Sequence, residues 1–313
     1  MQGFRIAGVH YYGETARSVE GIMDEQMAHY ATQIQTRYPV LCVVTAQRLG
    51  EGQNNDVLVV NGGLIFRFPR YEQGITVLEQ ELALLRALQE RVALAIPAPR
   101  YVALTPRRVG QVFMGYPLLP GTPLNATLLS HLTATESALL GRHIGTFLRD
   151  LHQVPLEEVL PGSTAGGDLL APWASLYARI QHHLFPHMRP DARARTAAHF
   201  ETFLHTPHNY AISPVLAHGD LGAGNILYDV QHRRLTGVID FSGAGPLDPA
   251  VDLAALSTLG GGILDAVART YLVTPALRDR AAFYRRTFAL QEALFGGENH
   301  DDAAFRAGIA EYL

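Results

Sequence analysis

Short β-rich runs are concentrated in the first part of this sequence, and helical patterns dominate the rest. Residues 41–49, 56–60 and 64–68 are rich in apolar and β-branched side chains, and turn-forming residues separate them. The pair Asn61-Gly62, between the second and third runs, is a strong signal for a β-hairpin. We therefore predict three consecutive antiparallel strands, and this segregation of strands from helices favours an α+β fold.

The segments around these strands complete a small lobe that we expect to span residues 27–116. The apolar spacing predicts a helix at 27–38 and another at 75–88, and residues 101–104 and 111–114 read as two further strands. Residues 1–26 show weak periodicity and are expected to be an N-terminal extension.

A larger and mainly helical lobe is expected over residues 117–313, after a connector rich in proline and glycine. A long helix is predicted at 134–152, opening with Thr135 as its cap, and helices close the chain from Val251 onward. A β-rich interlude at 215–241 interrupts the helical patterns.

Composition excludes several classes of protein. The net charge of −4 gives no reason to expect nucleic acid as a partner, and no apolar run approaches the ~20 residues of a membrane span. The N-terminus lacks the features of a secretory signal, so we expect a cytoplasmic protein. Cys42 is the one cysteine, which excludes an internal disulfide, and its apolar neighbours predict a buried thiol.

The sequence contains no lysine, so all 25 of its basic Lys+Arg residues are arginines. A compositional bias of the genome explains this best. Any cationic contact with phosphate must nevertheless come from arginine or from a metal ion.

The most informative segment runs from His218 to Asn225 and is followed by a strand that ends at Asp240. An Asp, then an Asn five residues later, then an Asp at a strand end is the order found in kinase-like enzymes. Phosphoryl transfer needs a carboxylate near the attacking hydroxyl and oxygen ligands for Mg²⁺. Asp220 is the candidate for the first role, and Asn225 and Asp240 are candidates for the second.

Glycines in and before this segment are assigned to tight turns. Gly222 and Gly224 are expected to let the catalytic loop turn. Gly50 and Gly52 join two predicted strands and are candidates to cover the phosphates of a nucleotide.

Two charged residues upstream fit the same interpretation. Arg67, in the third predicted strand, is expected to pair with Glu81 of the following helix and so to hold the α- and β-phosphates. Arg70 is an alternative cation for this role. Taken alone, each of these residues would be interpreted as an ordinary surface charge, and the order of the whole set is what favours the kinase-like interpretation.

With these motifs, the chain resembles the aminoglycoside phosphotransferase family over roughly residues 40–300, and most closely its 2''-phosphotransferase branch. Further stretches that carry the resemblance are Asp248 to Ala254, Gly121 to Leu124 and Phe147 to His152. The resemblance implies a protein-kinase-like fold of two lobes, with the nucleotide on the small lobe and the catalytic loops and substrate pocket on the large one.

The resemblance also implies the reaction. We expect ATP or GTP as co-substrate, Mg²⁺ as cofactor, a small-molecule hydroxyl as acceptor and a monomer or dimer. Met114 and Tyr116 are expected to offer backbone groups to the nucleotide base. The family often has lysine where this chain has Arg67. Arginine can bind phosphates at two points but is bulkier than lysine, so the position of the nucleotide in this chain stays open.

An aminoglycoside is a polycation, so its binding pocket needs carboxylates. Glu292, Glu298 and Asp301 are the candidates, and a solvated helix end explains the last two equally well. A kinase of another hydroxyl compound, such as a macrolide, a sugar derivative or a metabolite, stays open. A nucleotide-binding regulator without turnover is the third alternative, and the complete set of Asp220, Asn225 and Asp240 argues against it.

His218, Asp248 and Asp252 are given structural roles. His218 is expected to support the catalytic loop. Asp248 and Asp252 are expected to cap and brace the helix that starts near Pro249, because Asp is favoured at helix starts.

Overall fold

The computed structural model describes residues 25–51, 55–160, 170–206, 209 and 212–313. These residues fall into two compact units. The sheet unit comprises the described residues up to His143 together with residues 223–242. The helical unit comprises the described residues of 144–222 and 243–313.

The sheet unit is built on a five-stranded antiparallel sheet in the order β1-β2-β3-β5-β4. All five predicted strands are present, but the first begins at Ala46 instead of residue 41, and the fifth ends at Pro117, three residues beyond its predicted end. The strands are β1 (Ala46–Glu51), β2 (Asn55–Val60), β3 (Leu64–Pro69), β4 (Tyr101–Ala103) and β5 (Phe113–Pro117).

The hairpin between β2 and β3 forms where the sequence predicts it. Asn61 and Gly62 both have positive φ, at 51° and 65°, and Asn and Gly adopt this conformation at low cost. The prediction for Cys42 was wrong, because its side chain is exposed. The first strand begins only at Ala46, so Cys42 precedes the sheet.

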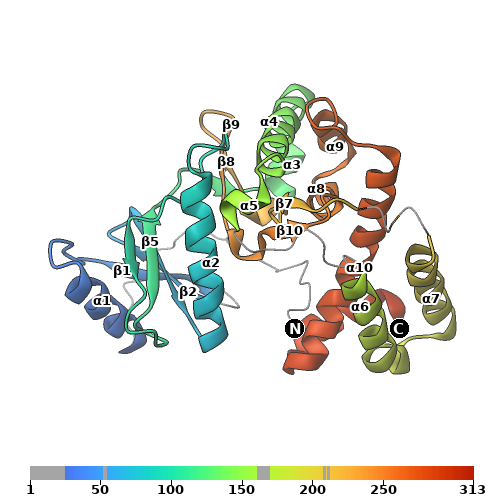
Figure 1. The fold of residues 1–313 in the computed structure, drawn as a ribbon, viewed down its shortest axis with the longest axis horizontal. Helices are drawn as coiled ribbons and strands as arrows, with labels where there is room; N and C mark the ends of the chain where they lie inside the picture. The colour runs from blue at the N-terminus through green and yellow to red at the C-terminus, as the bar shows by residue number, and fades with distance from the viewer. Residues whose placement is uncertain (1–24, 52–54, 161–169, 207–208, 210–211) are drawn as a thin grey trace. The chain divides into compact units, whose positions relative to one another are not determined.

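Two helices pack on this sheet. Helix α2 (Glu72–Leu88) contacts β3 and β5, and Figure 1 shows it running alongside the strands. Helix α1 (Glu25–Arg37) contacts β1. The core beneath α1 is aromatic: the rings of Tyr30 and Phe68 stack with centroids 4.0 Å apart, and Phe66 and Phe113 are fully buried.

The sheet unit also contains a three-stranded sheet of order β6-β8-β9, which carries part of the candidate site. Its strands are β6 (Thr122–Pro123), β8 (Ile226–Asp229) and β9 (Arg234–Val238), and α3 (Ala126–His131) follows β6. Helix α4 (Ala134–His152) matches its predicted bounds. Its cap is Thr133 instead of Thr135: the Thr133 hydroxyl accepts from the Glu136 N–H, and the Glu136 carboxylate accepts from the Thr133 N–H, which is a capping box.

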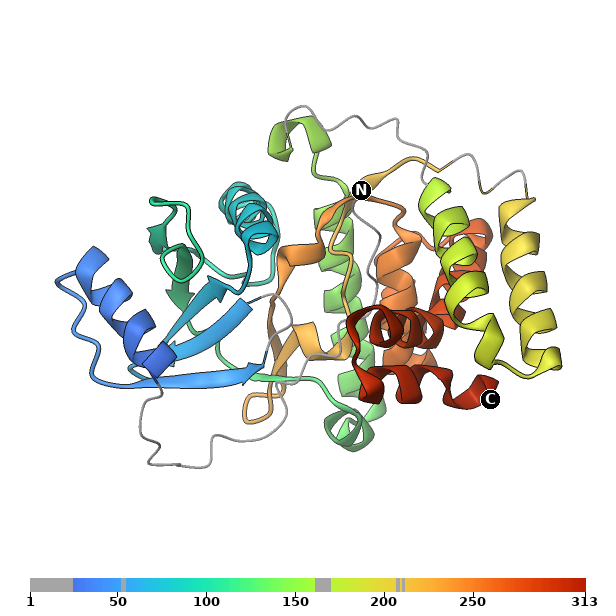
Figure 2. The same cartoon turned by 90° about the horizontal axis from the view of Figure 1, so that it is seen from below.

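The helical unit packs its helices around α10, and Figure 2 shows α6 and α7 side by side. Stacked aromatic rings fill its core. The ring centroids of Phe203 and Phe283 lie 3.7 Å apart, and those of Trp173 and Tyr284 lie 4.2 Å apart. The unit contains α5 (Leu156–Val159), α6 (Ala171–His183), α7 (Pro190–Leu204), β7 (Val215–Ala217), β10 (Gly245–Leu247), α8 (Ala250–Leu256), α9 (Gly261–Val267), α10 (Pro275–Asn299) and α11 (Asp302–Ile309).

The predicted α+β class is confirmed by the small antiparallel sheet and the helical remainder. The lobe boundary expected at residue 116 stays a prediction, and the sheet unit extends to His143. Most of the expected N-terminal extension lies outside the described residues. None of the described helices is long and apolar enough to cross a membrane.

Candidate active site

The buried pair of Arg67 and Glu81 joins the sheet to α2. Arg67 Nη1 donates to Glu81 Oε1 at 2.6 Å, and both side chains are almost fully buried. The same Glu81 oxygen accepts from the backbone N–H of Phe241 at 3.1 Å. Burial raises the pKa of the Glu81 carboxyl, and the Arg67 guanidinium opposes that rise.

Arg67 also contacts Asp240, which follows β9. Its Nη2 lies 3.5 Å from Asp240 Oδ1, so one guanidinium faces two carboxylates within the sheet unit. Asp240 has a φ of 63°, in the left-handed region that costs a side-chain-bearing residue energy. Residues held in this region cluster at functional sites, which agrees with the candidate role of Asp240.

Asn225 lies next to Asp240 in space because β8 and β9 pair. The Ile239 N–H donates to the Asn225 carbonyl at 2.9 Å, so the two predicted metal ligands sit at one end of this hairpin. Asn225 is 1% exposed. An amide oxygen and a carboxylate are hard oxygen donors of the kind that Mg²⁺ takes together with substrate phosphates. The donor set therefore fits Mg²⁺.

Asp220 belongs to the helical unit, in a loop that starts after β7. The residue before it, Gly219, has a φ of 81°, and a Cβ there would lie 2.4 Å from the Gly243 carbonyl oxygen. Gly222, by contrast, has no positive φ, and a Cβ there would meet nothing within 4 Å. Gly222 lies in a bend, as expected, but the backbone conformation and the close contact that require glycine are those of Gly219.

Asp252 of α8 holds the start of this loop. Its carboxylate accepts the backbone N–H groups of His218 and Gly219, each at 2.9 Å, and lies 3.0 Å from His152 Nε2. Burial would raise the pKa of Asp252, but the hydrogen bond from His152 and the N–H donors hold it below its ordinary value. Asp252 therefore braces the loop as an anion, and Tyr271 fixes the other ring nitrogen of His152 at 2.7 Å.

His218 and Asp248 have the structural roles expected of them. His218 is fully buried, and its Nδ1 accepts from the Asp220 N–H at 3.2 Å. Asp248 accepts from the Ala250 N–H at the start of α8 and also binds Arg280 at 2.6 Å. Sequence reasoning missed Gly219 and the support from His152, and it gave Asp252 a capping role instead of its loop-holding one.

The three predicted substrate carboxylates differ in how far they are already engaged. Glu298 forms a two-point ion pair with Arg179, one contact being Nε to Oε1 at 2.9 Å. Asp301 caps α11 by accepting from the N–H groups of Ala303 and Ala304. Glu292, on α10, makes no hydrogen bond or ion pair with any described residue, although it is partly buried.

Burial raises the pKa of the Glu292 carboxyl, and the negative charge of Asp301 adds to the rise. A carboxylate in this environment is stabilised by a cation that binds beside it. Glu292 is thus the one of the three whose charge lacks a partner in the described part of the chain.

Three of the remaining predicted residues lie in the five-stranded sheet. Gly50 is in β1, and Gly52 lies outside the described residues. Met114 and Tyr116 are buried in β5, where Met114 is the register partner of Arg67 in β3. Among the described residues there is no cluster of three or more His, Cys, Asp or Glu side chains that would hold a metal.

Comparison with known proteins identifies the family to which the chain belongs. The model of the phosphotransferase enzyme family matches residues 45–284, which include Arg67, Glu81, Asp220, Asn225 and Asp240. The chain belongs to the phosphotransferase enzyme family. It is a phosphotransferase, as the resemblance predicts.

Individual relatives of the phosphotransferase differ in their acceptors. This chain is 29% identical over 202 residues to viomycin phosphotransferase of Streptomyces vinaceus, and the match covers 62% of this chain and 67% of that protein. It is 30% identical over 150 residues to a probable ketoamine kinase of Lactiplantibacillus plantarum, covering 43% of this chain and 50% of that protein.

A solved structure supports the fold over nearly the whole chain. The GDP and kanamycin complex of an aminoglycoside 2''-phosphotransferase is similar with a TM-score of 0.83 and 26% identity, covering 90% of this chain and 96% of that one. The predicted kinase-like fold and the resemblance to this branch are confirmed.

Proposed function

We propose that this phosphotransferase moves the γ-phosphoryl group of ATP or GTP to a hydroxyl of a cationic, aminoglycoside-like acceptor. The observation that carries the proposal is the arrangement of Arg67 between Glu81 and Asp240. A buried cation that is held by one carboxylate and faces a second is suited to a bound triphosphate and its metal ion.

On the nucleotide side, Glu81 fixes the Arg67 guanidinium so that its remaining N–H groups bind the α- and β-phosphates. Asn225 and Asp240 would hold Mg²⁺, which when bound neutralises charge on the phosphate oxygens. The Asp240 carboxylate is held near the Arg67 guanidinium, with Oδ1 3.5 Å from Nη2. Met114 and Tyr116 are assigned to the base, and Gly50 and Gly52 to covering the phosphates.

On the acceptor side, the Asp220 carboxylate orients the attacking hydroxyl and accepts its proton. The hydrogen bonds that Asp252 receives from His218 and Gly219 keep the loop backbone in place without help from the substrate. Most of the rate acceleration then comes from positioning and charge neutralisation, as phosphoryl transfer requires.

The class of acceptor is assigned from the charge of Glu292. Glu292 is a partly buried carboxylate without a partner among the described residues, and a protonated amine of an aminoglycoside supplies the missing charge. The kanamycin in the related solved structure supports the same class. Viomycin is the second candidate acceptor, because the viomycin phosphotransferase relative shares 202 aligned residues with this chain.

The deciding experiment measures nucleotide consumption with ATP and GTP in parallel, with Mg²⁺ or with EDTA. The acceptor panel contains kanamycin, viomycin, a macrolide and a ketoamine. We expect Mg²⁺-dependent turnover with kanamycin or viomycin, and mass spectrometry of the product should show one added phosphoryl group. Turnover with the macrolide or ketoamine alone would overturn the acceptor assignment and leave the reaction class standing.

The catalytic assignment is tested with Asp220→Asn, which keeps the size of the side chain and removes its charge. We expect turnover to fall by at least about a hundredfold, which is the lower end of what a positioned base contributes. Nucleotide binding should be unchanged. Asp279→Asn, an exposed Asp on α10, is the matched control and should retain full activity.

A further inference from the structure

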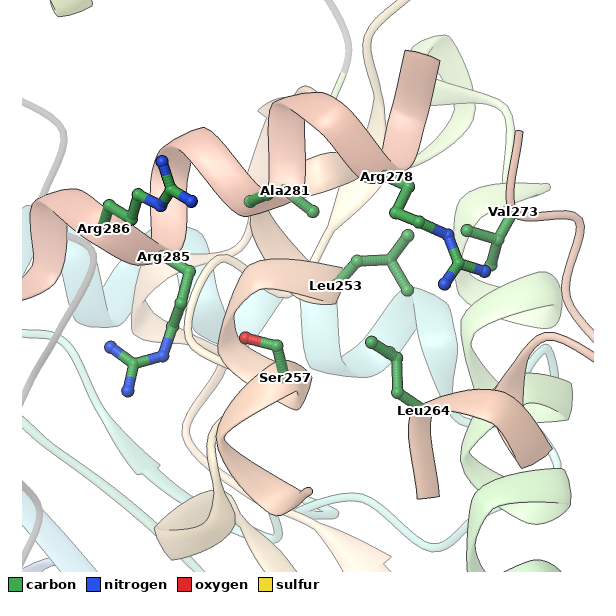
Figure 3. A pocket seen from close by; sticks show the side chains of 9 residues that line it. Leu253, Ser257, Leu264, Val273, Arg278, Ala281, Arg285 and Arg286 are labelled. Atoms are coloured by element: carbon green, nitrogen blue, oxygen red, sulfur yellow. The ribbon is translucent and has the colours of Figure 1, made fainter. Parts of the chain in front are cut away.

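A small cavity of about 260 Å³ lies within the helical unit, against one face of α10 (Figure 3). Four lining residues of α10 recur at the spacing of a single helix face: Arg278, Ala281, Ala282 and Arg285. The two alanines leave a hollow between the two arginines because their side chains are small.

The wall opposite α10 is apolar. It is formed by Leu253 of α8, Leu264 of α9 and Val273 of the segment before α10. Figure 3 shows Leu253 and Leu264 on the side of the cavity that faces the helix carrying Arg278, Ala281 and Arg285. Ser257 also lines the cavity, but its hydroxyl donates to the Ala254 carbonyl at 2.6 Å, so its proton is already used.

Three arginines and no carboxylate are among the lining residues, and the arginines line the cavity mostly with the aliphatic parts of their side chains because its surface is almost wholly apolar. Arg278, Arg285 and Arg286 are exposed, and none of them forms an ion pair with a described residue. Arg278 and Arg285 are two helical turns apart, about 10 Å along the axis. The surface of the hollow is almost wholly apolar, and the Arg285 guanidinium lies over the Phe288 ring with its Cζ 5.3 Å from the centroid, so these two exposed arginines carry their charges at its rim. An apolar hollow with cationic side chains at its rim suits a ligand that is apolar in its body and negative at its head.

We propose that this cavity binds a small amphipathic anion, with an aliphatic or aromatic body against Leu253 and Leu264 and a carboxylate or phosphate head on Arg278 or Arg285. Planar guanidinium groups bind both kinds of head at two points. The inference does not depend on the nucleotide or acceptor of the proposed reaction, because none of the residues assigned to that reaction lines the cavity.

Calorimetric titration of the full chain, without nucleotide, tests the inference. The probes are octanoate and octyl phosphate, and the controls are octan-1-ol and butanoate. We expect saturable binding of one or both anionic probes at one site, and the tighter of the two identifies the preferred head. Octan-1-ol should bind at least about tenfold more weakly, because it lacks the charged hydrogen bonds. Each methylene removed from the chain should weaken binding by about fourfold.

Two variants locate the site. The double variant Arg278→Gln with Arg285→Gln should weaken octanoate binding by at least about tenfold. Ala282→Leu fills the hollow with a residue that favours helix, and it should abolish binding without unfolding the chain. Arg306→Gln on α11 removes one charge at an exposed position outside the cavity and should bind octanoate as the unmodified protein does.

The proposal is overturned by any of three results. The first is that neither anion binds saturably at millimolar concentrations. The second is that the double variant binds octanoate as tightly as the unmodified protein does. The third is that octan-1-ol binds as tightly as octanoate. Thermal unfolding of each variant, measured in the same buffer, separates loss of the site from loss of the fold.

Discussion

At the scale of single residues, Arg67 balances the negative charges of Glu81 and Asp240. Its guanidinium contacts Glu81 at 2.6 Å and Asp240 at 3.5 Å, from two different nitrogens. A planar guanidinium makes both contacts at once, whereas an ammonium group is a point charge on a flexible stem. Lysine is therefore not an equivalent residue at this position of this chain.

Arg67→Lys should keep the chain folded and lower kcat/KM for the nucleotide by about tenfold, because one of two charged contacts is lost. Arg67→Met should cost about 3–5 kcal/mol of folding free energy, because it leaves the buried Glu81 without its cation. Urea unfolding and nucleotide kinetics measure the two effects. Arg70→Lys is the control, since Arg70 is 45% exposed in its side chain; a larger kinetic loss in that variant would transfer the phosphate-binding role to Arg70.

Glu292 predicts the pH dependence of acceptor binding. The ionised carboxylate attracts a cationic acceptor, and its raised pKa means that ionisation is lost at a higher pH than for an ordinary glutamate near 4.3. KM for the acceptor should therefore rise as pH falls from neutral through this raised pKa. In Glu292→Gln, KM should be high at all pH values and this dependence should disappear; identical profiles in both proteins would exclude Glu292 from the acceptor site.

The same shift predicts the opposite effect on stability. A carboxyl whose pKa is raised in the folded state contributes stability below its unfolded pKa, and this contribution is lost as pH rises through the folded pKa. At neutral pH the Glu292 charge therefore destabilises the fold. Glu292→Gln should have a higher thermal midpoint than the unmodified protein at neutral pH, and the difference should shrink on acidification.

At the scale of elements, the loop after β7 depends on one glycine. Gly219 has a φ of 81°, and a Cβ there would meet the Gly243 carbonyl at 2.4 Å, whereas a Cβ at Gly222 would enter open space. Gly219→Ala should lower kcat strongly or destabilise the chain, because backbone atoms must move. Gly222→Ala should retain activity within about twofold and gain a few tenths of a kcal/mol through a less flexible unfolded chain. Steady-state kinetics and thermal unfolding of the pair provide the test, and equal losses in both variants would contradict it.

A buried ion pair, whose removal should be costly, joins α10 to Asp248 in the segment just before α8. Asp248 binds Arg280 Nε at 2.6 Å and the Tyr284 hydroxyl at 2.6 Å. Arg280→Met should cost about 3–5 kcal/mol, because a buried carboxylate loses its cation. Tyr284→Phe removes one hydrogen bond to the same carboxylate and should cost about 1.5–3 kcal/mol. Equilibrium unfolding in urea ranks the two, and a larger cost for Tyr284→Phe would contradict this account.

The elements also show which parts of the structure follow from sequence. The β2-β3 hairpin was predictable because Asn61 and Gly62 determine a turn locally. The contact between Arg67 and Asp240 was not, because 173 residues separate the two and only tertiary folding joins them. The need for glycine at Gly219 also depends on a distant chain segment, Gly243, so no local pattern could have indicated it.

Some assignments were partly predictable. The sequence placed Asp252 at the start of a helix, where a capping role is the usual explanation. Its real partners are the backbone N–H groups of His218 and Gly219, which approach from a different segment. Cys42 was misplaced because apolar neighbours predict burial only when the run is a strand, and the strand begins at Ala46.

At the scale of the whole molecule, the chain carries its positive charge entirely on arginine. Guanidinium groups stay protonated above pH 12, whereas lysine ammonium groups titrate near 10.4. The 313 residues contain no side-chain amine for an amine-directed reagent to modify. Because we assign phosphate binding to Arg67, reagents that modify arginine should inactivate the phosphotransferase, whereas reagents that modify amines should not.

An excess of an N-hydroxysuccinimide ester should therefore modify only the N-terminal amine and leave turnover intact. Phenylglyoxal, which modifies guanidinium groups, should inactivate the phosphotransferase, and bound nucleotide should slow this inactivation because it covers Arg67. Arg67 is buried and its Nη1 donates to Glu81 at 2.6 Å, so its modification should be slower than that of the exposed arginines. Peptide mapping at partial inactivation measures both rates. If activity disappears before Arg67 is modified, or if nucleotide gives no protection, the cation that binds the phosphates is another arginine.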